Sequence, residues 1–116
     1  MWNKPMSEEL LRLPVFYSTE HVSLTEKVVH MHFFLGGCDW YACEYNPDEK
    51  LFFGFVILNN DYEMSEWGYF SLEELASIKV KWLEVDRDLY FSPTKAIDIE
   101  RIRKAQGWAE REIIAS

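Results

Sequence analysis

The chain has 116 residues, nearly half of them hydrophobic and 16% aromatic, which is enough for one domain over residues 1–116 to bury a core. No apolar run approaches the roughly 20 residues that cross a bilayer, and the first residues lack the apolar stretch of a secretion signal, so we expect a cytoplasmic protein. The net charge of −8 argues against direct nucleic-acid binding, because neutralising phosphates requires a basic surface.

The negative charge is concentrated in the first two thirds of the chain. Residues 1–78 carry 4 Lys or Arg against 13 Asp or Glu, whereas residues 79–116 carry 8 against 7. A surplus of carboxylates ordinarily serves solubility. The more specific alternative is an acidic surface that binds a basic protein partner.

The first elements are a short helix and a meander of strands. Ser7 is expected to cap a helix that runs to Leu13, before Pro14. Four segments then have the apolar patterns of strands: Val28 to Leu35, Asp39 to Tyr45, Leu51 to Leu58 and Ser65 to Phe70. The turns at 46–50 and 59–61 are short, which predicts antiparallel neighbours. The third strand is apolar on both faces and is therefore expected at the centre.

The remaining elements are two helices and a fifth strand. Ser71 and Glu74 form a capping-box sequence at the start of a helix that ends near Ile78. Residues 84–91 alternate and predict a strand, and residues 96–114 predict the longest helix, with Gly107 in its middle. The fold class is therefore α+β: a four- to five-stranded antiparallel sheet, a short helix after strand four and a long C-terminal helix. Whether that helix packs on its own sheet, and whether the chain is a homodimer, stays open.

Histidines and cysteines are the first candidates for chemistry. His30 and His32 alternate on one strand and share a face, so they could ligate a metal with Cys43 or Glu44. No metal-binding motif supports this, two half-buried histidines are the simpler interpretation, and we expect no cofactor. Cys38 and Cys43 lie five residues apart and face opposite sides of a strand, which argues against a disulfide. A Cys/His nucleophile pair is the alternative to a buried, inert thiol.

Acidic side chains form the most regular charge pattern. Glu84, Asp86 and Asp88 would share one face of the predicted strand at about 6.6–7 Å spacing, close to that of nucleic-acid phosphates. A second acidic group consists of Asp61, Glu63 and Glu66 and could extend this surface. The alternative is an ordinary solvated strand face.

Several motifs occur in a fixed order along the chain. They are Leu10 to Pro14, Phe16 to Glu20, Trp40-Tyr41 with Glu44, Leu51 to Gly54, Glu66 to Leu75, and Asp86 to Pro93. Over about residues 7–93 this order resembles a bacterial family of small proteins of unknown function from chromosomes, plasmids and other mobile elements. The resemblance implies that the polar motif residues Tyr41, Glu44, Arg87 and Asp88, with Glu66, are site candidates. Arg87 could instead form a structural ion pair.

Two classes of function follow from these observations. The leading hypothesis is a non-enzymatic, acidic protein-interaction module, because no catalytic signature accompanies the acidic surface. The family's genomic settings imply an accessory or anti-defence factor of a mobile element. The alternative is a small enzyme or a ligand- or metal-binding domain, with a site on the second sheet face near His30, His32, Tyr41 and Glu44.

Overall fold

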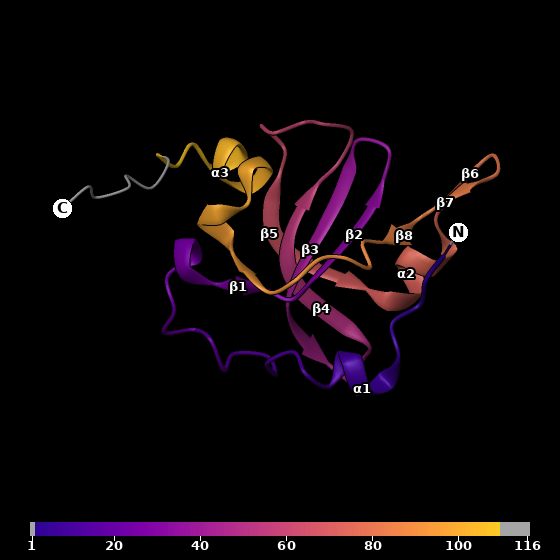
Figure 1. The fold of residues 1–116 in the computed structure, drawn as a ribbon, viewed down its shortest axis with the longest axis horizontal. Coiled ribbons are helices and arrows are strands. Elements are labelled where there is room, and N and C mark those ends of the chain that lie inside the picture. Colours follow the sequence, from indigo (N-terminus) through magenta and orange to yellow (C-terminus); the bar gives the residue numbers. More distant parts are fainter. Residues whose placement is uncertain (1, 110–116) are drawn as a thin grey trace.

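A five-stranded antiparallel sheet forms the centre of the molecule (Figure 1). The computed structural model describes residues 2–109. The strands, in the spatial order β5-β4-β3-β2-β8, are β5 (Glu66–Ser71), β4 (Leu51–Ile57), β3 (Cys38–Asn46), β2 (Met31–Leu35) and β8 (Asp86–Arg87). This confirms the α+β class and the antiparallel sheet, and it places β3 and β4 inside the sheet.

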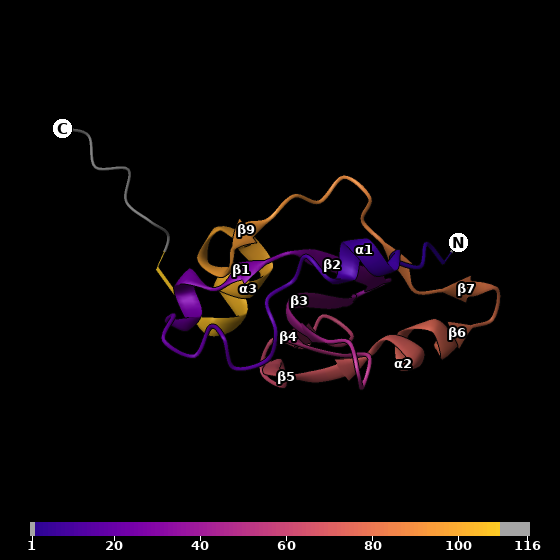
Figure 2. The same ribbon diagram turned by 90° about the horizontal axis from the view of Figure 1, so that it is seen from below.

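Short helices and strand pairs surround the sheet. The helices are α1 (Ser7–Leu10), α2 (Leu72–Ser77) and α3 (Glu100–Gln106), with 3-10 turns η1 (Leu24–Glu26) and η2 (Ala96–Asp98). Two strand pairs complete the fold: β1 (Val28–Val29) with β9 (Thr94–Lys95), and β6 (Lys79–Val80) with β7 (Leu83–Glu84). Figure 2 shows α3, β1 and β9 at one end of the molecule and α2 with the β6–β7 hairpin at the other.

Alternating strand residues build a core on each face of the sheet. Phe33 and Phe52 pack on the first face with Leu10 of α1 and Leu75 of α2. The second face carries a separate cluster that includes Tyr41, Phe55 and Ala96 together with Ile102 of α3. The C-terminal helix therefore packs on the sheet of its own chain, which settles the question that the sequence left open.

The predicted first strand is divided, and the predicted fifth strand is much shorter. His30 separates β1, which pairs with β9, from β2 in the main sheet. Within residues 84–91 only β7 and β8 have strand geometry, because the sheet hydrogen bonds end where Asp88 donates its N–H to the His32 carbonyl. Phe91 then donates back to the Asp88 carbonyl, which turns the chain and leaves Tyr90 98% exposed.

The predicted helix boundaries also change. Ser71 caps α2 as expected, since its side chain accepts the Glu74 N–H at 2.9 Å. The cap of α1 is Met6 rather than Ser7. Gly107 lies at the C-terminal cap of α3 with φ 68°, where the left-handed backbone ends the helix, so it is not a mid-helix residue. Positions 110–114 of the predicted helix lie outside the described residues. No helix within residues 2–109 has the length and apolar character needed to cross a membrane.

Candidate functional site

An open pocket lies at the β8 edge of the sheet. It has a volume of about 500 Å³, and we call it the edge pocket. Its lining residues come from the N-terminal segment, β2, the β2–β3 turn and the chain around β8: Asn3, His32, Phe34, Gly36, Asp39, Asp86, Arg87, Asp88, Leu89 and Tyr90. The edge pocket thus combines three carboxylates with aromatic and apolar side chains at the β8 edge of the sheet.

His32 is held in place from three sides at the edge pocket. Its Nε2 lies 2.7 Å from Asp39 Oδ1, and its Nδ1 lies 3.8 Å from Asp88 Oδ2. The ring stacks on Tyr41 with a centroid distance of 4.5 Å and an angle of 8°. Arg101 of α3 forms an ion pair with the other Asp39 oxygen at 2.8 Å. These contacts fix the orientation of the imidazole and bind α3 to the sheet.

Asp88 and Tyr90 form the open side of the edge pocket. The Asp88 side chain is 37% exposed, and one of its oxygens accepts the Tyr90 N–H at 3.0 Å. Leu89 is 58% and Phe34 is 37% exposed. A carboxylate beside exposed aromatic rings is a suitable environment for a cationic side chain, which can pair with the carboxylate and stack on the rings.

The three-carboxylate row predicted for residues 84–88 is not a continuous solvent-facing surface. Glu84 Oε1 accepts the Trp2 N–H at 2.7 Å, and Asp86 Oδ1 accepts from the Asn3 side chain at 2.6 Å. Burial acts to raise the pKa of Asp86, but hydrogen bonds from Asn3 and the Arg87 N–H outweigh it and lower the pKa. Two of the three carboxylates therefore hold the N-terminal segment against the sheet.

The second predicted acidic group does not extend the edge pocket. Glu66 lies on β5, at the opposite edge of the sheet from β8, and four strand spacings amount to about 19 Å. Asp61 and Glu63 lie in the connection between β4 and β5, where Asp61 accepts the Met64 N–H at 3.2 Å. None of the three lines the edge pocket.

Glu44 occupies a structural position beneath the loop that follows α1. A β-bulge between Ala42 and Glu44 shifts the register of β3 against β4 and places Glu44 opposite Phe53. The carboxylate is 5% exposed and accepts the N–H groups of Tyr17 and Thr19 at 3.2 and 3.3 Å, together with the Thr19 hydroxyl. It also borders a small pocket of about 190 Å³, but both of its oxygens are occupied by these donors.

Tyr41 and Arg87 also make contacts that support the fold: Tyr41 is buried, and Arg87 forms an ion pair. Tyr41 is 3% exposed, and burial raises the pKa of its hydroxyl well above the usual range. Arg87 Nη1 lies 2.9 Å from Glu9 Oε2, which is the structural ion pair given above as the alternative. The structure therefore brings Tyr41 to His32 and Arg87 to the edge pocket, but it leaves Glu44 outside that site.

His30 does not line the edge pocket, and it lies between β1 and β2 rather than beside His32 on one strand. Burial lowers the pKa of His30, which favours the neutral imidazole. It borders a second pocket of about 240 Å³ together with Glu9, Arg12 and Asp88. Among residues 2–109 no group of three His, Cys, Asp or Glu side chains has the arrangement of a metal site.

The two cysteines should differ strongly in reactivity. Both are free thiols; Cys38 packs against the first core and Cys43 lies in the second, as their spacing predicted. Burial raises the pKa of Cys43 to about 12, so almost none of it is thiolate at neutral pH. We expect a thiol reagent to modify Cys38 first in the native protein and Cys43 only after denaturation. Mass spectrometry of the wild type, Cys38→Ser and Cys43→Ser after brief labelling would check this, and equal native rates would contradict it.

Sequence reasoning missed Asp39, Phe34 and Asn3 as parts of the site. Asp39 pairs with Phe34 across the β2–β3 hairpin, which places its carboxylate diagonally beside His32. The Gly36-Gly37 turn, combined with the hairpin register, could have revealed this neighbourhood. Nothing in the sequence signals the Asn3 contact, because it joins residues 83 positions apart.

The structure defines a small α+β domain with an acidic, aromatic pocket at one edge of an antiparallel sheet. A family model matches residues 17–107, and the chain belongs to the family described as a protein of unknown function, DUF2958. This confirms the resemblance to a family of unknown function. The matched range extends through α3, beyond residue 93, and it begins after the motif Leu10 to Pro14. No curated protein and no solved structure matches the chain.

Proposed function

We propose that this chain is a non-enzymatic, cytoplasmic protein-interaction module that binds a basic side chain of a protein partner in the edge pocket. The observation that supports the proposal is the arrangement of Asp88 beside the exposed rings of Phe34 and Tyr90. In the mobile-element settings that the family resemblance implies, such a module would act as an accessory or anti-defence factor by contact with a basic protein.

The charge of the edge pocket supports a cationic occupant. Among residues 2–109, the carboxylates that line it are Asp39, Asp86 and Asp88, and the one arginine is Arg87, which forms an ion pair with Glu9. Asp39 is compensated by Arg101 from outside the pocket. A guanidinium group could stack on an aromatic ring while it donates hydrogen bonds to a carboxylate, a combination that lysine provides less well.

A defined peptide tests this proposal directly. We expect a short oligo-arginine peptide to shift the amide resonances of β8 and Tyr90 in a ¹⁵N-labelled sample, and binding should weaken as salt is added. Asp88→Asn and Tyr90→Ala should each weaken binding about tenfold, the equivalent of about 1.4 kcal/mol. Asp88→Asn removes one carboxylate charge with almost no change in shape.

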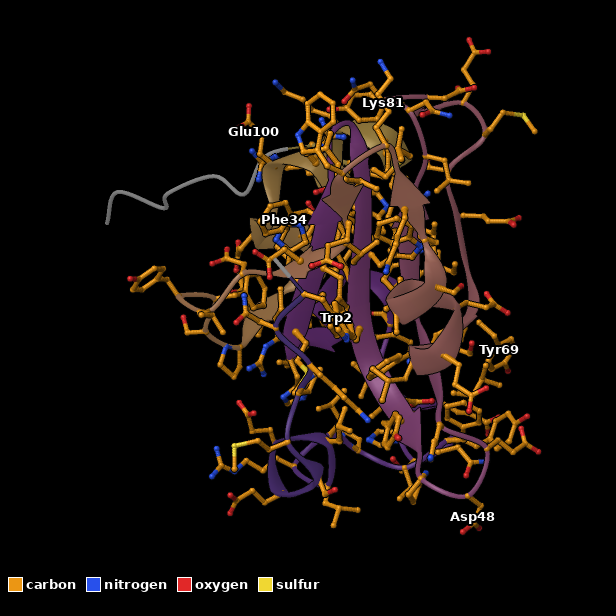
Figure 3. All side chains as sticks on the ribbon, turned by 90° about the vertical axis from the view of Figure 1, so that its right-hand side faces the viewer. Trp2, Phe34, Asp48, Tyr69, Lys81 and Glu100 are labelled. Atoms are coloured by element: carbon orange, nitrogen blue, oxygen red, sulfur yellow. The ribbon has the colours of Figure 1, made fainter. Side chains whose placement is uncertain are left out.

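Asp48→Asn is the matched control, because it removes the same charge from an exposed turn between β3 and β4. Figure 3 shows Asp48 at the lower end of the molecule, away from Phe34 at the edge pocket. This variant should bind the peptide like the wild type. Equal loss in Asp48→Asn and Asp88→Asn, or equal binding of an oligo-glutamate peptide, would contradict the proposal.

A further inference from the structure

The β6–β7 hairpin carries an apolar, basic tip that projects from the body of the molecule (Figure 1). Trp82 is 85% exposed, Val80 54% and Leu83 51%. Lys79 and Lys81 are the only charged residues from 79 to 83, in a chain with a net charge of −8. Exposed apolar groups of this size, and tryptophan above all, are typical of surfaces that contact another protein.

The base of the hairpin is held firmly, so the tip has a defined position. Glu84 accepts the Trp2 N–H at 2.7 Å, and the next residue, Val85, is completely buried in the first core. The turn is tight, because Val80 pairs with Leu83 and Lys81 has a φ of 59°. A two-stranded hairpin by itself is only marginally stable, so contact with another surface would stabilise this one.

The chain itself contains a surface that complements this tip. The edge pocket presents Asp88 with the exposed rings of Phe34 and Tyr90, whereas the hairpin presents lysines and an indole. The two surfaces are neighbours, because Val85 alone separates β7 from β8. A patch that contains both a projection and its complement can pair with itself across a two-fold axis, and this closes the assembly at two copies.

We infer that a second copy of this chain is an occupant of the edge pocket: the hairpin of each copy binds the edge pocket of the other. Trp82 then packs against the rings of Phe34 and Tyr90, and Lys81 lies beside Asp88. The inference rests on the proposed function, since it names one basic segment that the pocket binds. The two-fold axis repeats the contact between hairpin and pocket, so the area buried between the two copies is twice that of one contact. This doubling brings a small interface toward the roughly 1,200 Å² typical of stable complexes.

Sedimentation velocity on the full chain over the micromolar range tests the inference. We expect a reversible dimer whose dissociation constant rises at least tenfold in Trp82→Ala. Tyr69→Ala is the control, because it removes an aromatic ring, 53% exposed, from β5 at the opposite edge of the sheet. Trp82→Ala should melt at the temperature of the wild type, since its indole is largely in solvent. Tyr69→Ala controls for dimerisation alone, because the Tyr69 ring also packs against Phe16 and Phe53.

A charge exchange gives the sharpest result. Lys81→Glu and Asp88→Lys should each weaken dimerisation, because both contacts of the homodimer then join like charges. In an equimolar mixture, the hairpin of the first variant meets the pocket of the second with reversed charges, and the other contact is wild type. The mixture should therefore dimerise as well as the wild type. A monomer at every concentration, or a mixture no better than the separate variants, would overturn the inference.

The two proposals can fail separately. Lys81→Glu alters the hairpin and leaves the lining of the edge pocket unchanged, so it should still bind the oligo-arginine peptide. A monomeric wild type that binds the peptide would overturn self-association and leave the pocket in place. A dimer that survives both Trp82→Ala and Asp88→Lys would overturn the inferred interface, whatever the peptide shows.

Discussion

Replacing Gly54 with alanine is expected to destabilise the protein by about 4 kcal/mol or more, or to prevent folding. Gly54 lies in β4 opposite Ala42 of β3, next to the β-bulge. A Cβ added there would lie 1.8 Å from the Tyr41 carbonyl oxygen and 2.8 Å from its carbon. These are backbone atoms of an interior strand, so they cannot move aside without breaking the sheet. Urea unfolding followed by tryptophan fluorescence would measure the loss.

Gly68→Ala provides the matched control. Gly68 is the partner of Gly54 in the register of β4 and β5. Apart from its two chain neighbours, no described residue has an atom within 4 Å of the position that its Cβ would take. The same substitution one strand away should change the free energy of unfolding by no more than about 0.5 kcal/mol. If both variants lost stability equally, the close approach of β3 to Gly54 would not be the cause.

Removal of the Glu44 carboxylate should cost about 3 kcal/mol of folding stability. In Glu44→Ala the N–H groups of Tyr17 and Thr19 lose their acceptors inside the protein. The effect reaches Lys27, which is 7% exposed and donates to the same Thr19 hydroxyl that donates to Glu44. We expect a lower urea midpoint and faster proteolysis in the loop at 15–23.

Glu49→Ala is the corresponding control, because Glu49 is an exposed glutamate in the turn between β3 and β4. It should change stability by less than about 0.5 kcal/mol. Glu44→Gln should fall between the two, since an amide keeps one acceptor oxygen and loses the charge. Full stability in Glu44→Ala would show that the loop finds other acceptors and would contradict the structural role given to this residue.

The sheet could be predicted from the sequence because its signals are local. Alternating residues in β2 and the short turn between β3 and β4 indicate antiparallel neighbours without any information about distant contacts. The pattern failed where a long-range contact decides the conformation. Residues 84–91 alternate like a strand, but Glu84 and Asp86 are held by Trp2 and Asn3, and the chain turns after Asp88.

The candidate site was predictable only in part. Charges and motifs in the sequence predict Asp86, Asp88 and Arg87 as site residues, and all three line the edge pocket. The neighbouring Asp39 and Arg101 could not be predicted. The position of Asp39 beside His32 depends on the register of the β2–β3 hairpin, and the ion pair of Arg101 with Asp39 depends on how α3 packs on the sheet. The family motif makes Glu44 a site candidate, and the structure places its carboxylate outside the edge pocket, where it accepts the N–H groups of Tyr17 and Thr19. A charged motif residue in a small domain can serve either purpose, and its hydrogen-bond partners decide which.

The contacts of Trp2 and Asn3 with Glu84 and Asp86 also affect the order in which the chain can fold. They join residues 82 and 83 positions apart, so closing them costs more loop entropy than any hairpin of the sheet. During synthesis on a ribosome, β2 to β5 can pair before residue 84 has been made, while the first residues wait for their partners. The edge pocket is therefore expected to be among the last parts to form, and a chain that ends before β8 should lack it even if the central strands have assembled.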